Sequence, residues 1–241
     1  MVKPEDIQSV FFLGIGGIGM SALARYFHIR GYRVAGYDRT PSPLTQELEH
    51  EGIVITYEDD VEWFEKLLLP QKHTLVVRTP AVPEETALCI HLRAKNYAML
   101  KRAEVLGFIT KQMRSLCVAG THGKTTTSTM LAHLIYQSEV GTNAFLGGIS
   151  LNYGTNVLLQ KESPYVVVEA DEYDRSFHHL SPCMSIITAV DPDHLDIYGT
   201  EEAYREAFEH YTSLISEVLV VKQGIALSPR MRKGAKVYTY G

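Results

Sequence analysis

The sequence predicts an α/β protein with two domains, spanning residues 1–112 and 113–241. Short apolar runs typical of buried strands alternate along the chain with segments whose apolar residues recur at helical spacing, a pattern that favours parallel sheets covered by helices. Two of these runs lead into glycine-rich turns, at residues 14–19 and 120–123. Since one sheet rarely needs two phosphate-binding turns, we expect each turn to belong to its own domain.

Composition narrows the class of protein. The 241 residues are 45% apolar and 21% charged, which is typical of a soluble globular protein. The net charge of −5 lacks the basic excess of nucleic-acid-binding proteins, so we expect no nucleic-acid partner. There is no run of 18 apolar residues and no secretory signal, so we expect no membrane insertion. The three scattered cysteines fit a reducing, cytoplasmic location, and nothing indicates an oligomeric state.

The first glycine turn follows a predicted strand at 9–13 and opens a helix whose expected inner face includes Ile18, Ala22, Leu23, Tyr26 and Phe27. A second strand is predicted at 33–37, with Asp38 at its end. This G-x-G-x-x-G in a β–α–β unit indicates a Rossmann-like domain in which the turn approaches a pyrophosphate and the acid accepts from a ribose hydroxyl. Taken alone, the turn would suggest a nicotinamide dehydrogenase.

The remainder of the first domain continues the alternation. We predict helices at 44–51, 61–69, 84–95 and 102–113, and strands at 53–56, 74–77 and 98–100. Because ligands of such sheets bind at the carboxyl ends of the strands, Asp38, Arg78 and Thr79 are placed on one rim. For Thr79 an ordinary loop position is an equal alternative.

The second glycine turn has the form expected of a polyphosphate site. A strand at 116–119 leads into GTHGKTT at 120–126, and a helix follows with Met130, Leu131, Leu134 and Ile135 at helical spacing. Backbone N–H groups and the positive helix end face an anion there, Lys124 reaches the β- and γ-phosphates, and Thr125 holds Mg²⁺. The alternative is a glycine-rich turn carrying a surface lysine. This alternative is less favoured because the motif lies between a predicted strand and a predicted helix, as a phosphate-binding turn does.

Acidic residues follow the next predicted strands. The strand at 164–168 ends in Glu169, which we predict as an Mg²⁺ ligand. Asp171 and Glu172 are predicted to support this ligand without binding the metal ion directly. The alternative is an acidic surface loop. The strand at 183–190 ends in DPDHLD, where the acids around His194 favour metal binding or catalysis over a plain surface histidine.

The rest of the second domain carries weaker indications of function. Residues 140–159 suggest loops and short strands, and further strands are predicted at 218–221 and 236–240. Thr200 caps a helix with a core stripe of Tyr204, Ala207, Phe208, Tyr211 and Leu214.

Four co-linear motifs resemble the Mur ligases: GIGGIGM at 14–20, GTHGKTTT at 120–127, EADEYDRSF at 169–177 and DHLDIYG at 193–199. The resemblance covers essentially the whole chain. The histidine of the phosphate turn and the GIGGxGM turn favour the member that adds L-alanine to UDP-N-acetylmuramate in peptidoglycan precursor synthesis. A paralogue that attaches a recycled murein tripeptide to the same sugar nucleotide remains an alternative.

The resemblance replaces the dehydrogenase hypothesis, which also leaves Lys124, Thr125 and Glu169 unexplained. It implies that the first domain holds the UDP part of the substrate. The UDP-sugar residues it implies are Gly14, Ile15, Gly16, Gly17, Gly19, Asp38 and Thr79. The ATP residues it implies are Gly120, Thr121, His122, Gly123, Lys124, Thr125 and Thr126.

For the chemistry, the resemblance implies that Thr125 and Glu169 bind Mg²⁺ and that His194 binds a second Mg²⁺. His122 either faces the substrate carboxylate or only shapes the turn. The implied catalytic set is Lys124, His122, Glu169 and His194. The lactyl carboxylate would attack the γ-phosphorus of ATP, and the amine of L-alanine would then attack the resulting acyl phosphate.

Two features depart from the family pattern. The end of the central domain and the C-terminal domain are missing, and Ala189 stands where asparagine is common. We therefore expect an incomplete second domain, and a chain that binds the UDP-sugar but ligates little or nothing. A UDP-sugar or nucleotide-binding module without catalysis remains the alternative.

Overall fold

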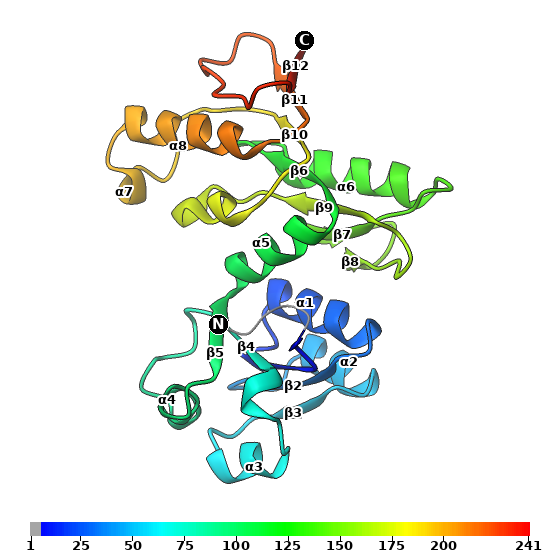
Figure 1. Ribbon diagram of the computed structural model, residues 1–241, viewed down its shortest axis with the longest axis vertical. Helices are drawn as coiled ribbons and strands as arrows, with labels where there is room; N and C mark the ends of the chain where they lie inside the picture. The colour runs from blue at the N-terminus through cyan, green and yellow to red at the C-terminus, as the bar shows by residue number, and fades with distance from the viewer. Residues whose placement is uncertain (1–5) are drawn as a thin grey trace. The chain divides into compact units, whose positions relative to one another are not determined.

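A computed structural model describes residues 6–241 of the chain. The chain forms two compact units, Met1–Val105 and Leu106–Gly241 (Figure 1). The division falls inside helix α5 (Arg102–Gln112), a few residues before the predicted boundary. The end of α5 belongs to the second unit, because a Cβ added at Gly107 would lie 2.2 Å from the carbonyl oxygen of His179, and Thr110 Oγ1 accepts a hydrogen bond from Ser181 N at 3.1 Å.

The first unit is built on a five-stranded parallel sheet with strand order β3-β2-β1-β4-β5. Ser9 lies in register with Arg33 on one neighbouring strand and with Thr74 on the other. The chain order reverses beside β1, and sheets of this kind bind their ligands at such a switch point, which here lies at the carboxyl ends of β1 and β4. The strands are β1 (Ser9–Leu13), β2 (Arg33–Tyr37), β3 (Val54–Thr56), β4 (Thr74–Arg78) and β5 (Ala98–Lys101).

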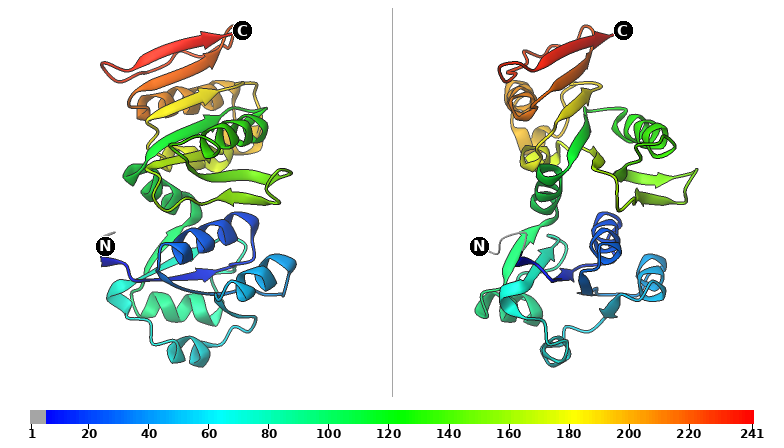
Figure 2. Two further views of the ribbon diagram at one scale, coloured as in Figure 1. Left: turned by 90° about the vertical axis from the view of Figure 1, so that its right-hand side faces the viewer. Right: turned by 45° about the vertical axis from the view of Figure 1, so that its right-hand side comes forward.

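Helices cover both faces of this sheet (Figure 2). Successive side chains of β1 point to opposite faces. Phe11 packs on Phe64 of α3, with ring centroids 4.8 Å apart, and Phe12 packs on Phe27 of α1 at 6.5 Å. The helices are α1 (Ile18–Ile29), α2 (Pro43–His50), α3 (Val61–Lys66) and α4 (Ala87–Ala94), with a 3₁₀ turn at η2 (Gln71–His73). The predicted Rossmann-like sheet is therefore confirmed.

Two predictions in this unit are wrong: the end of the helix predicted at 61–69 and the inward position of Ile18. Helix α3 ends at Lys66 because Leu68 adopts a left-handed backbone conformation, with φ of 51°, and its side chain is 82% exposed. Ile18 is the first residue of α1, and its exposed fraction is 42%. Both residues lie at helix ends, where apolar periodicity alone does not fix the direction of a side chain.

The second unit is built on a seven-stranded sheet with strand order β12-β11-β10-β6-β9-β7-β8. Each neighbouring pair in this order is parallel except β7 and β8, which form an antiparallel hairpin. Helix α6 covers one face, and α8 with η3 covers the other (Figure 2). The strands are β6 (Arg114–Ala119), β7 (Asn143–Ser150), β8 (Thr155–Leu158), β9 (Tyr165–Glu169), β10 (Met184–Ile187), β11 (Val218–Lys222) and β12 (Lys236–Tyr240). The helical segments are α6 (Lys124–Tyr136), η3 (Tyr173–His179), α7 (Leu195–Tyr198) and α8 (Glu201–Leu214).

Local patterns predict this second unit unevenly. The core stripe of α8 is confirmed, with Tyr204, Phe208 and Tyr211 fully buried. By contrast, only half of the apolar stripe predicted for α6 faces the core: Leu131 and Ile135 pack with Ala132 against it, whereas Met130 and Leu134 are exposed. Residues 140–159, predicted as loops and short strands, contain the eight-residue strand β7, whose pairing with β8 shifts register between Phe145 and Ser150.

Within residues 6–241, no helix is both long and apolar enough to span a lipid bilayer.

The three thiols give a test of the packing. Cys89, Cys117 and Cys183 are free; the first two are buried, and burial raises the pKa of Cys117 to about 12. Since a buried, protonated thiol is a poor nucleophile, we expect a disulfide-exchange reagent at pH 8 to label at most Cys183 rapidly in the native chain, and all three thiols after unfolding. Rapid labelling of all three in the native chain would contradict this packing.

Candidate functional site

The turn at residues 120–123 is held against the loop that follows β10. Gly120 needs to be glycine, because its φ is 136° and an added Cβ would lie 2.3 Å from the hydroxyl oxygen of Thr188. Thr121 N donates to Ala189 O at 3.1 Å, and Thr121 Oγ1 donates to Asp191 O at 2.7 Å. Ala189 makes this contact through its backbone, so the contact does not depend on the side chain at this position. These bonds fix the turn over the start of α6.

Helix α6 begins with an anion-receptive end. Gly123 precedes it with φ of 80°. Among the described residues, no side chain caps the helix by hydrogen bonding, and its first turn contains no acid. The first N–H groups of such a helix are left for an external partner, and the helix dipole favours that partner being negative. Thr125 and Thr126, in this first turn, are exposed.

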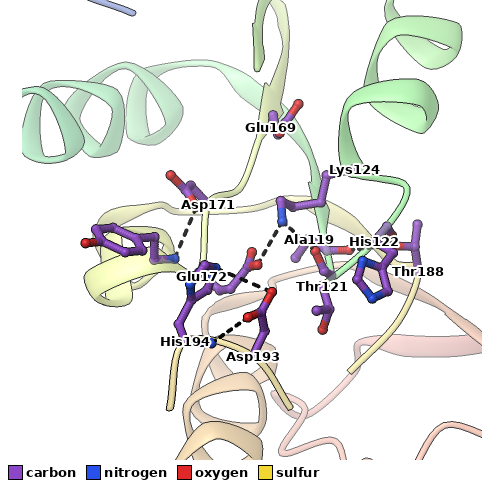
Figure 3. Close-up of polar contacts among 12 residues, drawn as sticks. Ala119, Thr121, His122, Lys124, Glu169, Asp171, Glu172, Thr188, Asp193 and His194 are labelled. Atoms are coloured by element: carbon purple, nitrogen blue, oxygen red, sulfur yellow. Dashed lines mark hydrogen bonds and ion pairs between the residues drawn. The ribbon is translucent and has the colours of Figure 1, made fainter. Parts of the chain in front are cut away.

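Lys124 extends back over the turn (Figure 3). Its Nζ donates to Gly120 O and to Glu172 Oε1, both at 2.8 Å. Glu172 is only 1% exposed, and burial raises the pKa of its carboxyl group while the Lys124 ammonium opposes that rise. The sequence predicts Glu172 as a support for the metal ligand Glu169, whereas in the structure Glu172 forms an ion pair with Lys124.

Glu169 ends β9 and sits in a small cradle. Its Oε1 accepts from Thr125 Oγ1 at 3.1 Å, and its Oε2 accepts from Gly147 N at 2.9 Å and from Ser128 Oγ at 3.4 Å. A Cβ at Gly147 would lie 2.3 Å from Oε1 and 2.4 Å from Oε2, so only glycine leaves room for this carboxylate. The structure thus brings together Thr125 and Glu169, the two residues predicted to share one metal ion.

His122 and His194 stand apart from that pair. His122 is exposed, and its carbonyl accepts a hydrogen bond from Thr188 Oγ1. His194 has a left-handed backbone with φ of 51°, and its ring packs edge-on against Tyr173 at 5.2 Å. In Figure 3, Glu169 and His194 lie on opposite sides of the contact between Lys124 and Glu172, so the two predicted metal ligands are not adjacent.

These residues fit Mg²⁺ and a polyphosphate by donor chemistry. Hydroxyl and carboxylate oxygens are the ligands that Mg²⁺ prefers, and Mg²⁺ takes its remaining ligands from phosphate and water. The described part of the chain contains no group of three or more His, Cys, Asp or Glu side chains placed to hold a metal ion. A cavity of about 390 Å³ opens beside the turn and is lined by residues that include Thr188, Asp191, Tyr204, Arg205 and Lys222.

The Gly147 cradle gives a test of the metal assignment. Gly147→Ala should displace the Glu169 carboxylate and lower Mg²⁺ affinity by about tenfold or more. Gly148→Ala is the matched control, because its added Cβ would lie 3.4 Å from Thr125 Cγ2, which is an ordinary van der Waals contact, and no closer to any other neighbouring side chain. Calorimetric titration of ATP with and without Mg²⁺ checks this, and an equal Mg²⁺ response in both variants would contradict the assignment.

The glycine turn of the first unit is a separate site. Gly14 N and Ile15 N donate to Tyr37 O at 2.8 and 3.0 Å, and Gly16 N donates to Asp38 Oδ2 at 2.7 Å. Asp38 Oδ1 accepts from Arg39 N at 2.8 Å, so Asp38 holds the turn together in addition to any contact with a ligand. A Cβ at Gly14 would lie 2.4 Å from Thr79 Cγ2.

Not every predicted residue of this turn offers its side chain to a ligand. Ile15 is fully buried and packs against Gly36, which leaves only its backbone. Gly17 precedes α1, and Gly19 lies against Arg102, whose Nε would be 2.3 Å from an added Cβ. The predicted site residues of this unit therefore gather at one turn, between the ends of β1, β2 and β4.

The sequence does not predict the roles of three residues that shape this site. Glu172 is the ion-pair partner of Lys124, Thr188 supports the glycine turn, and Gly147 leaves room for the Glu169 carboxylate and donates a hydrogen bond to it. Glu172 and Thr188 each lie near the end of a predicted strand, where a polar residue could have been weighed more heavily. Gly147 lies in residues 140–159, where the sequence predicts loops and short strands but gives no bounds for any one strand.

Taken together, the fold and the site define a two-unit α/β protein in which each unit carries a glycine turn between a parallel strand and a helix, and the second turn leads into a lysine at the start of its helix. Residues 9–114 match the Mur ligase family, catalytic domain, and residues 118–241 match the Mur ligase middle domain. The chain belongs to the Mur ligase family.

Similar proteins agree with this assignment. The chain is 58% identical over 238 residues to UDP-N-acetylmuramate–L-alanine ligase of Phocaeicola vulgatus, and 56% identical over 236 residues to that of Porphyromonas gingivalis. These matches cover 98% and 97% of this chain and 52% of each relative, so the chain spans about half the length of the curated relatives it matches.

Solved structures share the fold. The crystal structure of UDP-N-acetylmuramate-alanine ligase from Thermotoga maritima superposes with a TM-score of 0.79 and 30% identity, covering 96% of this chain and 52% of that one. A murein peptide ligase from Psychrobacter arcticus superposes with a TM-score of 0.77 at 23% identity, covering 97% of this chain and 53% of that one, and supports the fold alone.

Proposed function

We propose that the chain carries the UDP-sugar and ATP sites of an ATP-dependent amide ligase that joins L-alanine to the lactyl carboxylate of UDP-N-acetylmuramate. The observation that carries the proposal is Lys124 lying over an uncapped helix end, beside the contact between Thr125 and Glu169. The names of the relatives that are 56–58% identical supply the substrates. A cytoplasmic location is part of the proposal, because ATP is required and the cysteines are free.

In the proposed reaction, the lactyl carboxylate attacks the γ-phosphorus of ATP and releases ADP. The amine of L-alanine then attacks the acyl phosphate, phosphate leaves, and the amine loses a proton. Lys124 and the N–H groups of the turn stabilise the charge that develops on the phosphates. Thr125 and Glu169 would hold Mg²⁺, which would neutralise phosphate charge. His194 is assigned to a second Mg²⁺ ion, and His122 is assigned to the substrate carboxylate.

The diphosphate of the UDP-sugar is assigned to the first glycine turn, including Gly14, Gly16, Gly17, Asp38 and Thr79. The N-terminus of α1 is also without a side-chain cap among the described residues. The cavity beside Thr188 offers space for the remainder of the ATP molecule.

Calorimetry with three ligands tests this proposal. We expect UDP-N-acetylmuramate and Mg-ATP to bind independently of one another, and NADH not to bind. Binding of NADH without binding of UDP-N-acetylmuramate would overturn the proposal. In a longer version of the protein, release of ADP that depends on L-alanine, compared with release that depends on a murein tripeptide, distinguishes the proposed ligase from its paralogue, whereas we expect little or no such release from the 241-residue chain.

A further inference from the structure

The contact between Lys124 and Glu172 places a buried negative charge beside the residue that is to bind phosphate. The side chain of Glu172 is 1% exposed and that of Lys124 is 15% exposed, so water screens this pair poorly. In addition, Glu172 Oε2 is buried, and no donor among residues 6–241 reaches it. A buried carboxylate with one unsatisfied oxygen depends strongly on its single cationic partner.

The backbone of Glu172 is fixed by hydrogen bonds to its carbonyl group. Its carbonyl accepts hydrogen bonds from Tyr198 Oη and from Arg175 N, the latter at 2.9 Å. Arg175 also lies over the ring of Tyr198, 4.9 Å from its centroid, and has a left-handed backbone with φ of 62°. Of the two partners, the long lysine side chain is therefore the one able to move.

The ammonium group has a limited number of hydrogen bonds to give. It carries three N–H donors, and the ligand-free chain already uses two of them, on Gly120 O and Glu172 Oε1. A bridge to the β- and γ-phosphates requires two donors. One present partner must then be released, and of the two only Glu172 competes with the phosphates as a negative charge.

The second carboxylate on this segment has a different set of partners. Glu169 is held by Thr125, Ser128 and the backbone of Gly147. The two glutamates are three residues apart and have different partners: Glu169 contacts the first turn of α6, and Glu172 contacts the ammonium group of Lys124. Figure 3 shows this separation.

We infer that Glu172 is the counter-ion that occupies Lys124 in the ligand-free protein, and that a bound polyphosphate takes its place. The inference rests on the proposed nucleotide site. Glu172 is then a positioning residue that holds Lys124 ready and weakens nucleotide binding by competing for its charge. Removing its charge should tighten binding, whereas a residue with only a structural role would leave binding unchanged or weaker.

The test uses the 241-residue chain with ATP and inorganic tripolyphosphate as probes, in the presence of Mg²⁺. Glu172→Gln keeps the shape of the side chain and removes its charge, and Glu169→Gln is the matched control. We expect Glu172→Gln to tighten both probes on the order of tenfold, the worth of one charged hydrogen bond. Glu169→Gln should weaken both probes, because it removes the proposed metal ligand.

A second measurement avoids mutation. In the wild-type chain with ¹³C-labelled glutamate, the Glu172 carboxyl resonance should shift when tripolyphosphate saturates the site, because the carboxylate loses its ammonium partner. An unshifted resonance, or unchanged or weaker binding by Glu172→Gln, overturns the inference while leaving the nucleotide site intact. Failure of the wild-type chain to bind either probe overturns both the inference and the proposed ATP site.

Discussion

Replacing Lys124 with alanine lowers the affinity for ATP by about a hundredfold and leaves the affinity for UDP-N-acetylmuramate unchanged. The lysine supplies a charge-assisted contact to two phosphates, and each such hydrogen bond contributes about 1.5–3 kcal/mol, which together amount to a hundredfold or more. The UDP-sugar is assigned to the other unit, so its binding should not respond. Calorimetric titration of each ligand into both proteins measures the two effects.

The control for this prediction is Lys161→Ala. Lys161 is an exposed lysine between β8 and β9, so the substitution removes the same charge from the same unit without touching the phosphate turn. Lys124→Ala also leaves Glu172 buried without its cation, which should lower thermal stability. Lys124→Ala combined with Glu172→Gln should recover part of that stability but none of the ATP affinity. An unchanged ATP affinity in Lys124→Ala would remove Lys124 from the proposed site.

The parts of the site that the sequence predicts well are those encoded locally. A strand, a glycine turn and a helix follow one another at residues 114–136, and the turn carries Lys124 and Thr125 because of its own order of residues. The same holds for β1, the first glycine turn and α1. Parallel pairing then places the ends of neighbouring strands at one edge, which is how Glu169 reaches Thr125.

The parts that the sequence predicts poorly depend on backbone directions that no periodicity encodes. Glu172 turns toward Lys124 where the chain leaves β9, immediately before Asp174 and Arg175 adopt left-handed conformations. His194 is likewise left-handed and turns toward Tyr173. Such conformations are uncommon outside glycine, so the spacing of acids and histidines alone does not show which of them share a site.

Replacing Gly14 with alanine should abolish most UDP-sugar binding while leaving ATP binding intact. The φ of Gly14 is 87°, and an added Cβ would lie 2.4 Å from Thr79 Cγ2 and 3.1 Å from Val82 Cγ2. The turn or the Thr79 loop must therefore move, and a shift of this size in a positioned site costs about a hundredfold. Titration of UDP-N-acetylmuramate measures the loss, and titration of Mg-ATP serves as the internal reference.

Gly31→Ala separates this local effect from backbone strain. Gly31 has the same φ of 87°, but apart from Gly31 and its two chain neighbours no described residue has an atom within 4 Å of its added Cβ. Both variants should lose about 1–2 kcal/mol of stability from the left-handed alanine, while only Gly14→Ala should lose the UDP-sugar. If both variants lost the ligand equally, the loss would follow from strain in the first unit, and the glycine turn would no longer be supported as the diphosphate site. If neither lost it, the close approach of Thr79 to Gly14 would have no part in binding.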